Sequence, residues 1–68
     1  MLGQKIKAYL DANGIKQTFI CEKTNINKSA FTAILAGTRK IEAVEYYKIC
    51  QALNVDMLTF MTDAESEN

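Results

Sequence analysis

The apolar residues of this chain recur every three or four positions along most of its length, a spacing that predicts helices. In the first segment Leu2, Ile6 and Leu10 share one side, and charged residues stand between them. Asn13 and Gly14 then interrupt the pattern, and Gly14 suits the left-handed conformation that ends many helices. No stretch alternates apolar and polar residues as a half-buried strand would. The pattern therefore predicts an all-α chain.

Residues 17–37 are predicted to form two short helices joined by a tight turn. The first starts near Gln17, and the second covers about residues 28–36 and ends at Gly37. The turn between them needs a left-handed residue, and Asn25 adopts that conformation more readily than most residues other than glycine. This is the layout of a helix-turn-helix, in which one helix is presented to the major groove of DNA.

The second of these helices has two chemically different faces. Asn27 directly precedes it and is a good N-cap. One face is apolar and is expected in the core: Ala30, Phe31 and Ile34. The other face is polar or small: Lys28, Ser29, Thr32 and Ala33. This division predicts a helix that lies on the core and leaves its polar side accessible.

Two more helices are expected after Gly37. One covers about residues 42–53, ends at Asn54 in the left-handed conformation, and is expected to bury Ala43, Cys50 and Leu53. It also buries either Tyr46 or Tyr47, since both cannot be fully buried on one face. A short last helix follows over residues 57–61, capped by Asp56. Its apolar residues exceed what the core needs, which suggests a self-association patch of Met57, Leu58, Phe60 and Met61. The prediction is a compact five-helix domain over residues 1–61 with an acidic, flexible tail over residues 62–68.

Composition excludes several classes of protein. A chain of 68 residues holds one domain at most. It has no histidine, so a histidine general base and a His-containing triad are excluded. Cys21 and Cys50 are expected as small buried side chains and not as a disulfide or zinc site. No signal peptide or membrane span is recognisable, which favours the cytoplasm. We expect no enzyme activity, cofactor, metal or small-molecule ligand.

The charge is unevenly distributed although the net charge is zero. Residues 16–40 carry five positive charges against Glu22 alone, a net of +4. Three acidic residues fall in the tail over residues 62–68. The positive charge therefore collects on the segment predicted to meet DNA.

In combination these features resemble a known family, the phage repressor and Cro-like helix-turn-helix domains of the XRE type. The resemblance covers residues 6–60. The residues that carry it are Ile6, Gly14, Ile15, Gln17, Ile20, Cys21, Glu22, Lys23, Ile26, Ser29, Phe31, Ile34, Gly37, Arg39, Lys40, Lys48, Ala52, Leu53 and Val55. No one of them is specific, but the set in register is. It implies a lambda-repressor-like DNA-binding fold.

The resemblance also implies roles for particular side chains. Its base-reading positions correspond here to Lys28, Ser29 and Thr32, flanked by Ala33. Phosphate contacts would come from Gln17, Asn27 and the loop residues Thr38, Arg39 and Lys40, and Lys16 adds a positive charge near them. The chemistry fits, because Lys28 can donate to guanine, and Ser29 and Thr32 can donate or accept.

One departure from the family concerns a partly buried ion pair. The family commonly has Arg on its first helix and Glu at the end of its third, where this chain has Leu10 and Leu35. Replacing both partners by apolar residues avoids an unpaired buried charge. We therefore expect Leu10 to contact Leu35; the alternative is an exposed Leu35.

These inferences favour a transcription regulator, a stand-alone Cro-like repressor that binds a pseudo-palindromic operator as a homodimer. Two domains related by a two-fold axis would read half-sites about one helical turn apart. Two alternatives stay open. The chain could be the DNA-binding antitoxin of a toxin–antitoxin pair, with its tail binding the toxin, or a helix-turn-helix module that binds only protein.

Overall fold

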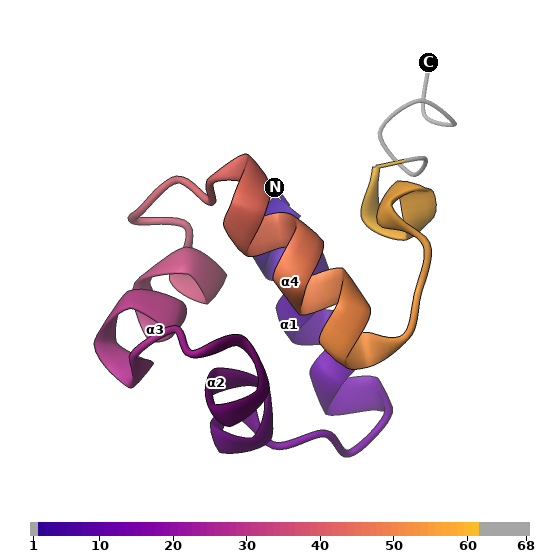
Figure 1. Cartoon of the computed structure of the whole chain (residues 1–68), viewed down its shortest axis with the longest axis horizontal. Helices are drawn as coiled ribbons and strands as arrows, with labels where there is room; N and C mark the ends of the chain where they lie inside the picture. The colour runs from indigo at the N-terminus through magenta and orange to yellow at the C-terminus, as the bar shows by residue number, and fades with distance from the viewer. Residues whose placement is uncertain (1, 62–68) are drawn as a thin grey trace.

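The computed structural model describes residues 2–61, and these residues form helices and connecting loops without a strand. The α-helices are α1 (Leu2–Ala12), α2 (Gln17–Thr24), α3 (Lys28–Ala36) and α4 (Ala43–Leu53), and a 3-10 helix, η1 (Met57–Phe60), follows them (Figure 1). The all-α prediction is confirmed. The tail predicted over residues 62–68 lies outside the described residues.

The fifth helix predicted over residues 57–61 is not an α-helix, because Met57–Phe60 form the 3-10 helix η1. The amide of Thr59 donates to the carbonyl of Asp56 at 2.9 Å, and that of Met61 to Leu58 at 3.0 Å. Both bonds join residues three apart, which is the 3-10 pattern. Asp56 caps the segment as predicted, since its carboxylate accepts from the Leu58 amide at 2.8 Å. Four residues complete little more than one such turn.

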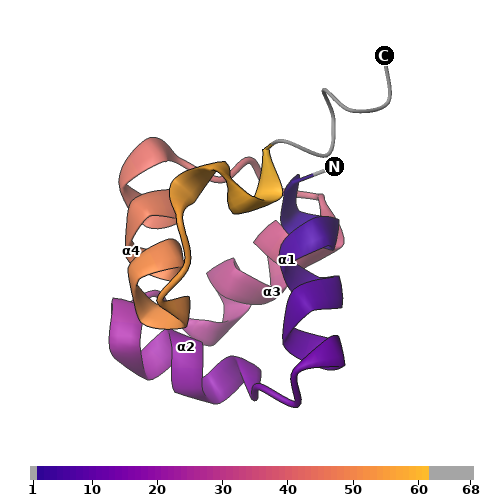
Figure 2. The same ribbon diagram turned by 90° about the vertical axis from the view of Figure 1, so that its right-hand side faces the viewer.

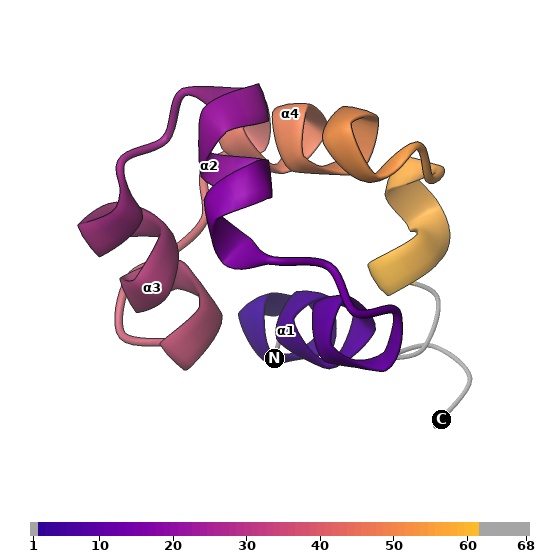
Figure 3. The same cartoon turned by 90° about the horizontal axis from the view of Figure 1, so that it is seen from below.

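The helices are arranged so that α2 and α3 lie at one end and η1 at the other, as Figures 1 and 3 both show. Helix α1 contacts α3, and α2 contacts both α3 and α4. The short η1 contacts α1 and α4 and closes the gap between them (Figure 2). The helix-turn-helix is therefore supported from behind by α1 and α4.

Every helix contributes to one apolar core. Its buried members are Ile6, Leu10, Ile20, Phe31, Leu35, Tyr46, Ile49, Cys50 and Phe60. Tyr46 is thus the buried tyrosine, whereas Tyr47 is 49% exposed. Ala43 was expected in the core but is exposed, and Ile49 takes the buried position on α4 instead.

Leu10 and Leu35 both lie in this core, which removes the alternative of an exposed Leu35. They are 1% and 2% exposed, belong to the same cluster, and come from the contacting helices α1 and α3. An unpaired charge at either position would be buried without compensation. The two leucines therefore occupy buried positions in one apolar cluster.

Four left-handed residues end the helices or shape the turns. Asn25 and Asn54 have φ values of 62° and 59°, and Gly14 and Gly37 have 65° and 83°. The two asparagines were predicted in this conformation and are confirmed. Asn25 is the one that matters for the site, because it ends α2 at the turn that leads into α3.

Gly3 allows α1 to approach α3 at backbone distance. A Cβ atom at this position would lie 1.9 Å from the carbonyl oxygen of Ile34, far inside any real contact. That oxygen belongs to the main chain of α3 and cannot rotate away. The first turn of α1 therefore lies directly on the last turn of α3, and glycine is the residue that fits.

Candidate nucleic-acid interface

The start of α3 is fixed by the turn before it. The side-chain oxygen of Asn27 accepts a hydrogen bond from the amide of Ala30 at 2.8 Å, which confirms the predicted N-cap. In the preceding helix the Thr24 hydroxyl is buried and donates to the carbonyl of Ile20 at 2.7 Å. The Thr24 bond lies within α2, so it is the Asn27 cap that holds the first turn of α3.

The polar face of α3 is accessible along its length. Lys28, Ser29 and Thr32 are exposed, and Ala33 is half-buried. With Ala36 and Thr38 they line one shallow, open depression. Within residues 2–61 the side chains of Lys28, Ser29 and Thr32 form no hydrogen bond or ion pair with another residue, so their polar groups are available. The structure thus brings the four expected base-reading residues together on one surface.

The start of α2 belongs to the same helix-turn-helix, in which α2 contacts α3. Gln17 is the first residue of α2 and is half-buried, while Lys16 before it is exposed and extended. The Lys16 side chain makes no capping bond, as a lysine at this position predicts. Within residues 2–61 its ammonium group forms no hydrogen bond or ion pair. The ammonium group of Lys23, in the last turn of α2, lies 5.6 Å from the centroid of the exposed ring of Phe19.

The loop between α3 and α4, residues 37–42 and hereafter the α3–α4 loop, is held at its start by α3. The carbonyl of Ala33 accepts from the amides of Thr38 at 3.1 Å and Arg39 at 3.3 Å. The Thr38 hydroxyl donates to the same oxygen at 3.3 Å. Thr38 is therefore placed next to the polar face of α3 and contributes to the same depression.

Arg39 does not have the free side chain that the sequence suggested. Its guanidinium donates to both carboxylate oxygens of Glu45, at 3.0 Å and 2.8 Å, in a two-pronged ion pair. The hydrogen bonds of this pair raise the pKa of Arg39 and lower the pKa of Glu45 from their ordinary values. Both groups stay charged at neutral pH, so Arg39 carries an internal counterion.

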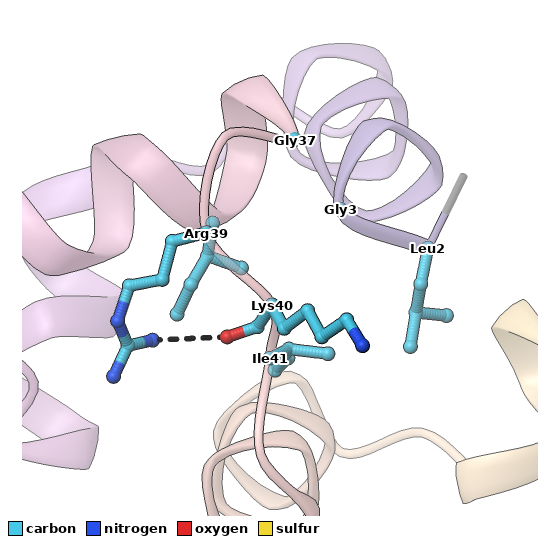
Figure 4. A pocket seen from close by; sticks show the side chains of 7 residues that line it. Leu2, Gly3, Gly37, Arg39, Lys40 and Ile41 are labelled. Atoms are coloured by element: carbon cyan, nitrogen blue, oxygen red, sulfur yellow. Dashed lines mark hydrogen bonds between the residues drawn. The ribbon is translucent and has the colours of Figure 1, made fainter.

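Arg39 and Lys40 leave the loop in opposite directions (Figure 4). Lys40 extends across an apolar pocket of about 260 Å³ towards Leu2 at the start of α1, while Arg39 turns to the far side of the loop. Ile34 and Ile41 supply much of the apolar lining. Lys40 is exposed and has no ion pair within the described part of the chain. The Arg39 guanidinium therefore pairs with α4, whereas the Lys40 side chain lies over the pocket beside α1.

The predicted self-association patch is smaller than expected. Met57, Leu58 and Met61 are 38%, 59% and 47% exposed, but Phe60 is only 4% exposed. Phe60 was wrongly placed in the patch, because its ring stands edge-on to Tyr9 at 5.5 Å and to Tyr46 at 6.4 Å between centroids. Its contacts come from α1 and α4, which the local pattern of η1 cannot reveal.

The cysteines take no part in this surface. Cys50 is buried, Cys21 is partly buried, and both are free thiols. Burial raises the pKa of each thiol, so neither is an activated nucleophile. Among residues 2–61 no group of acidic, cysteine or histidine side chains is arranged to hold a metal ion.

Comparison with known proteins identifies a family for the chain. A family model described as the Cro/C1-type HTH DNA-binding domain matches residues 5–64. The chain belongs to the Cro/C1-type helix-turn-helix family. No curated protein and no solved structure matches it. None of the Cro/C1-type domain's described helices has the length and apolar character needed to cross a membrane.

Two residues of this Cro/C1-type domain were missed by sequence reasoning. Glu45 was not expected as the partner of Arg39, because the pair spans six residues across a loop and has no helical spacing. Gly3 was not expected at a backbone contact, since a glycine early in a helix gives no such signal. For the Arg39–Glu45 pair, the only clue in the sequence is that the two residues carry opposite charges.

Proposed function

We propose that this protein is a sequence-specific transcription regulator, a Cro-like repressor that inserts α3 into the major groove of its operator. The observation that carries the proposal is the polar face of α3, whose Lys28, Ser29 and Thr32 side chains are exposed and unpaired in the described chain. Buried or internally bonded side chains could not reach base edges. The family membership adds that domains of this type bind DNA.

In the proposed complex the side chains divide into two roles. Lys28, Ser29 and Thr32 contact base edges, with Ala33 close to the groove. The phosphate contacts come from Gln17, Lys16, Asn27, Lys40 and Thr38, whose hydroxyl would turn from the Ala33 carbonyl to the phosphate. Because the oxygen of Asn27 accepts the capping bond, its amide nitrogen is the group left to donate to a phosphate. Phosphate contacts position the protein, whereas base contacts select the sequence.

We further propose that two copies associate through Met57, Leu58 and Met61. These exposed apolar side chains lie on and beside η1, at the opposite end of the molecule from α3 (Figure 1). A second copy seated there leaves both α3 helices uncovered. A two-fold pair would match a pseudo-palindromic operator, which one small domain cannot read with comparable affinity.

The main test of the function is the salt dependence of DNA affinity. Binding to a selected operator should weaken steeply with salt, because each neutralised phosphate releases a condensed counterion. Lys28→Ala should relax preference at particular base pairs, each base contact being worth about 1–3 kcal/mol. Lys40→Ala should weaken binding to all DNA sequences equally. It should also reduce the slope of log affinity against log salt by about 0.9. A wild-type protein without salt-dependent binding would show a module for protein partners instead.

The association is tested separately by sedimentation. Leu58→Glu should shift the protein towards monomer and weaken operator binding, because a charge enters the apolar patch. Val44→Glu is the matched control, since Val44 is 63% exposed and lies on α4 outside the patch. Equal behaviour of the two variants would contradict association through η1.

A further inference from the structure

The carboxylate of Glu45 is a meeting point for three hydrogen bonds. Two come from the Arg39 guanidinium, and the third comes from the amide of Glu42 at 2.9 Å. Glu42 is the N-cap of α4, and Glu45 lies in its first turn. One side chain therefore ties both the middle and the end of the α3–α4 loop to the start of α4.

The Arg39–Glu45 pair is better protected than an ordinary surface pair. The side chains are 37% and 19% exposed, and the guanidinium and carboxylate meet in the two-pronged geometry that gives charge-assisted bonds their strength. Arg39 also donates to the carbonyl of Lys40 at 3.4 Å. The side chain thus contacts the backbone of the residue beside it as well as α4.

The alternative role for Arg39 is direct contact with a DNA phosphate. A guanidinium committed to a carboxylate would have to leave that partner or share it, and the pair as a whole has no net charge. Lys40 differs, because it leaves the loop on the other side and has no counterion within the described residues (Figure 4). The electrostatic attraction of the loop for DNA therefore rests on Lys40.

We propose that Arg39 and Glu45 are positioning residues for DNA binding, which hold the α3–α4 loop so that Thr38 and Lys40 meet the phosphate backbone. In this arrangement Arg39 acts through Glu45 and α4 and contributes little to counterion release. The proposal rests on the proposed function. It assigns Glu45, an acidic residue beside a DNA-binding surface, a role that favours binding.

The first test compares substitutions at position 39 on a fixed operator. Arg39→Ala and Arg39→Lys should both weaken binding by about tenfold, the size expected when a charge-assisted hydrogen-bonded link is lost. Lysine keeps the charge but lacks the planar fork that grips both oxygens of Glu45. The salt slope of both Arg39 variants should stay near that of the wild type, whereas Lys40→Ala lowers it. If Arg39→Lys binds like wild type and Arg39→Ala lowers the slope by about 0.9, Arg39 contacts phosphate and the proposal is overturned.

The second test uses position 45, with Glu42→Gln as a matched control. Both substitutions remove one negative charge from the start of α4, but only Glu45→Gln releases the Arg39 guanidinium. Glu45→Gln should therefore steepen the salt slope, by up to about 0.9 as the freed arginine finds a phosphate. It should also lower affinity at high salt, where the loosened loop dominates. Identical slopes and affinities for the two variants would overturn the proposal.

Two controls separate this proposal from other failures. Far-ultraviolet circular dichroism of each variant confirms that a loss of affinity is not a loss of folding. The wild-type salt titration comes first: if it shows no salt dependence, the proposed DNA-binding function itself is overturned before any variant is compared. If the wild type binds with a steep slope and the variants disagree with expectation, only the roles of Arg39 and Glu45 are wrong.

Discussion

The two ends of α3 have opposite surroundings. At its start, Asn27 caps the helix, and Lys28, Ser29 and Thr32 face outward. At its end, Leu35 is buried in the core, and the carbonyl of Ile34 lies against the backbone at Gly3. The polar side chains of this nine-residue helix thus lie in its first half, whereas its backbone contact with α1 is made at its last turn. The comparison teaches that the precision of the exposed end depends on contacts made at the buried end.

The largest expected effect is at the buried end, from Leu35→Glu. A single charge there has no partner and should lower the free energy of unfolding by about 3–5 kcal/mol, enough to unfold much of so small a domain. The double variant Leu10→Arg with Leu35→Glu should recover much of that loss. Thermal unfolding followed by circular dichroism measures both. Losses that simply add in the double variant would contradict a direct contact between positions 10 and 35.

Gly3→Ala should be the next most damaging change. The added Cβ meets a backbone oxygen of α3, so the helices must separate, at a loss of about 3 kcal/mol in unfolding free energy. Helix propensity favours alanine by at most about 1 kcal/mol and does not reverse the sign. Gly14→Ala is the control, because nothing lies within 4 Å of a Cβ there and only its left-handed φ of 65° opposes the change. In denaturant unfolding, the Gly3→Ala variant should have a much lower free energy of unfolding than the Gly14→Ala variant.

Asn25→Ala tests the turn that leads into the exposed end. Alanine at a φ of 62° should reduce stability by about 1–2 kcal/mol, because its Cβ crowds the backbone in the left-handed region. Asn25→Gly should keep stability near that of wild type, since glycine adopts this conformation freely. Chemical denaturation of the three proteins gives the ranking. Equal losses for alanine and glycine would point to a role of the Asn25 side chain itself.

The smallest effect on stability is expected at the exposed face. Lys28→Ala should change the unfolding free energy by less than about 0.5 kcal/mol. The Lys28 side chain is exposed and forms no hydrogen bond or ion pair within residues 2–61. Its effect should appear in DNA affinity alone. A loss of stability as large as that of Asn25→Ala would show that the two ends of α3 are less different than the structure indicates.

Sequence reasoning succeeded where the signal is local. Asn25, Asn27, Asn54 and Gly37 each change the backbone at their own position, and each has the predicted conformation or cap. The burial of Leu10 and Leu35 was predicted in another way. Both leucines stand at positions where the resembled family commonly has the two charged residues of an ion pair. The polar face of α3 followed from helical spacing.

The failures share a different cause, which is dependence on tertiary contacts. Phe60 looked like its exposed neighbours until α1 and α4 covered it. Gly3 and Ile34 are thirty-one positions apart, and nothing local marks their approach. Arg39 was read as a free cation because its partner lies on the next helix. The sequence therefore predicted which side chains form the surface of the candidate site. It did not predict the hydrogen bonds and ion pair that these side chains make with the rest of the fold.

The edge-on contacts of Phe60 with Tyr9 and Tyr46 have an optical consequence. The chain contains three tyrosines and no tryptophan, so tyrosine dominates its absorption near 280 nm. Near-ultraviolet circular dichroism is sensitive to aromatic rings held in fixed packing. Two of the three tyrosines contact Phe60, so this signal reports the attachment of η1 to α1 and α4. The protein thus contains an intrinsic spectroscopic probe of the segment through which we expect it to dimerise.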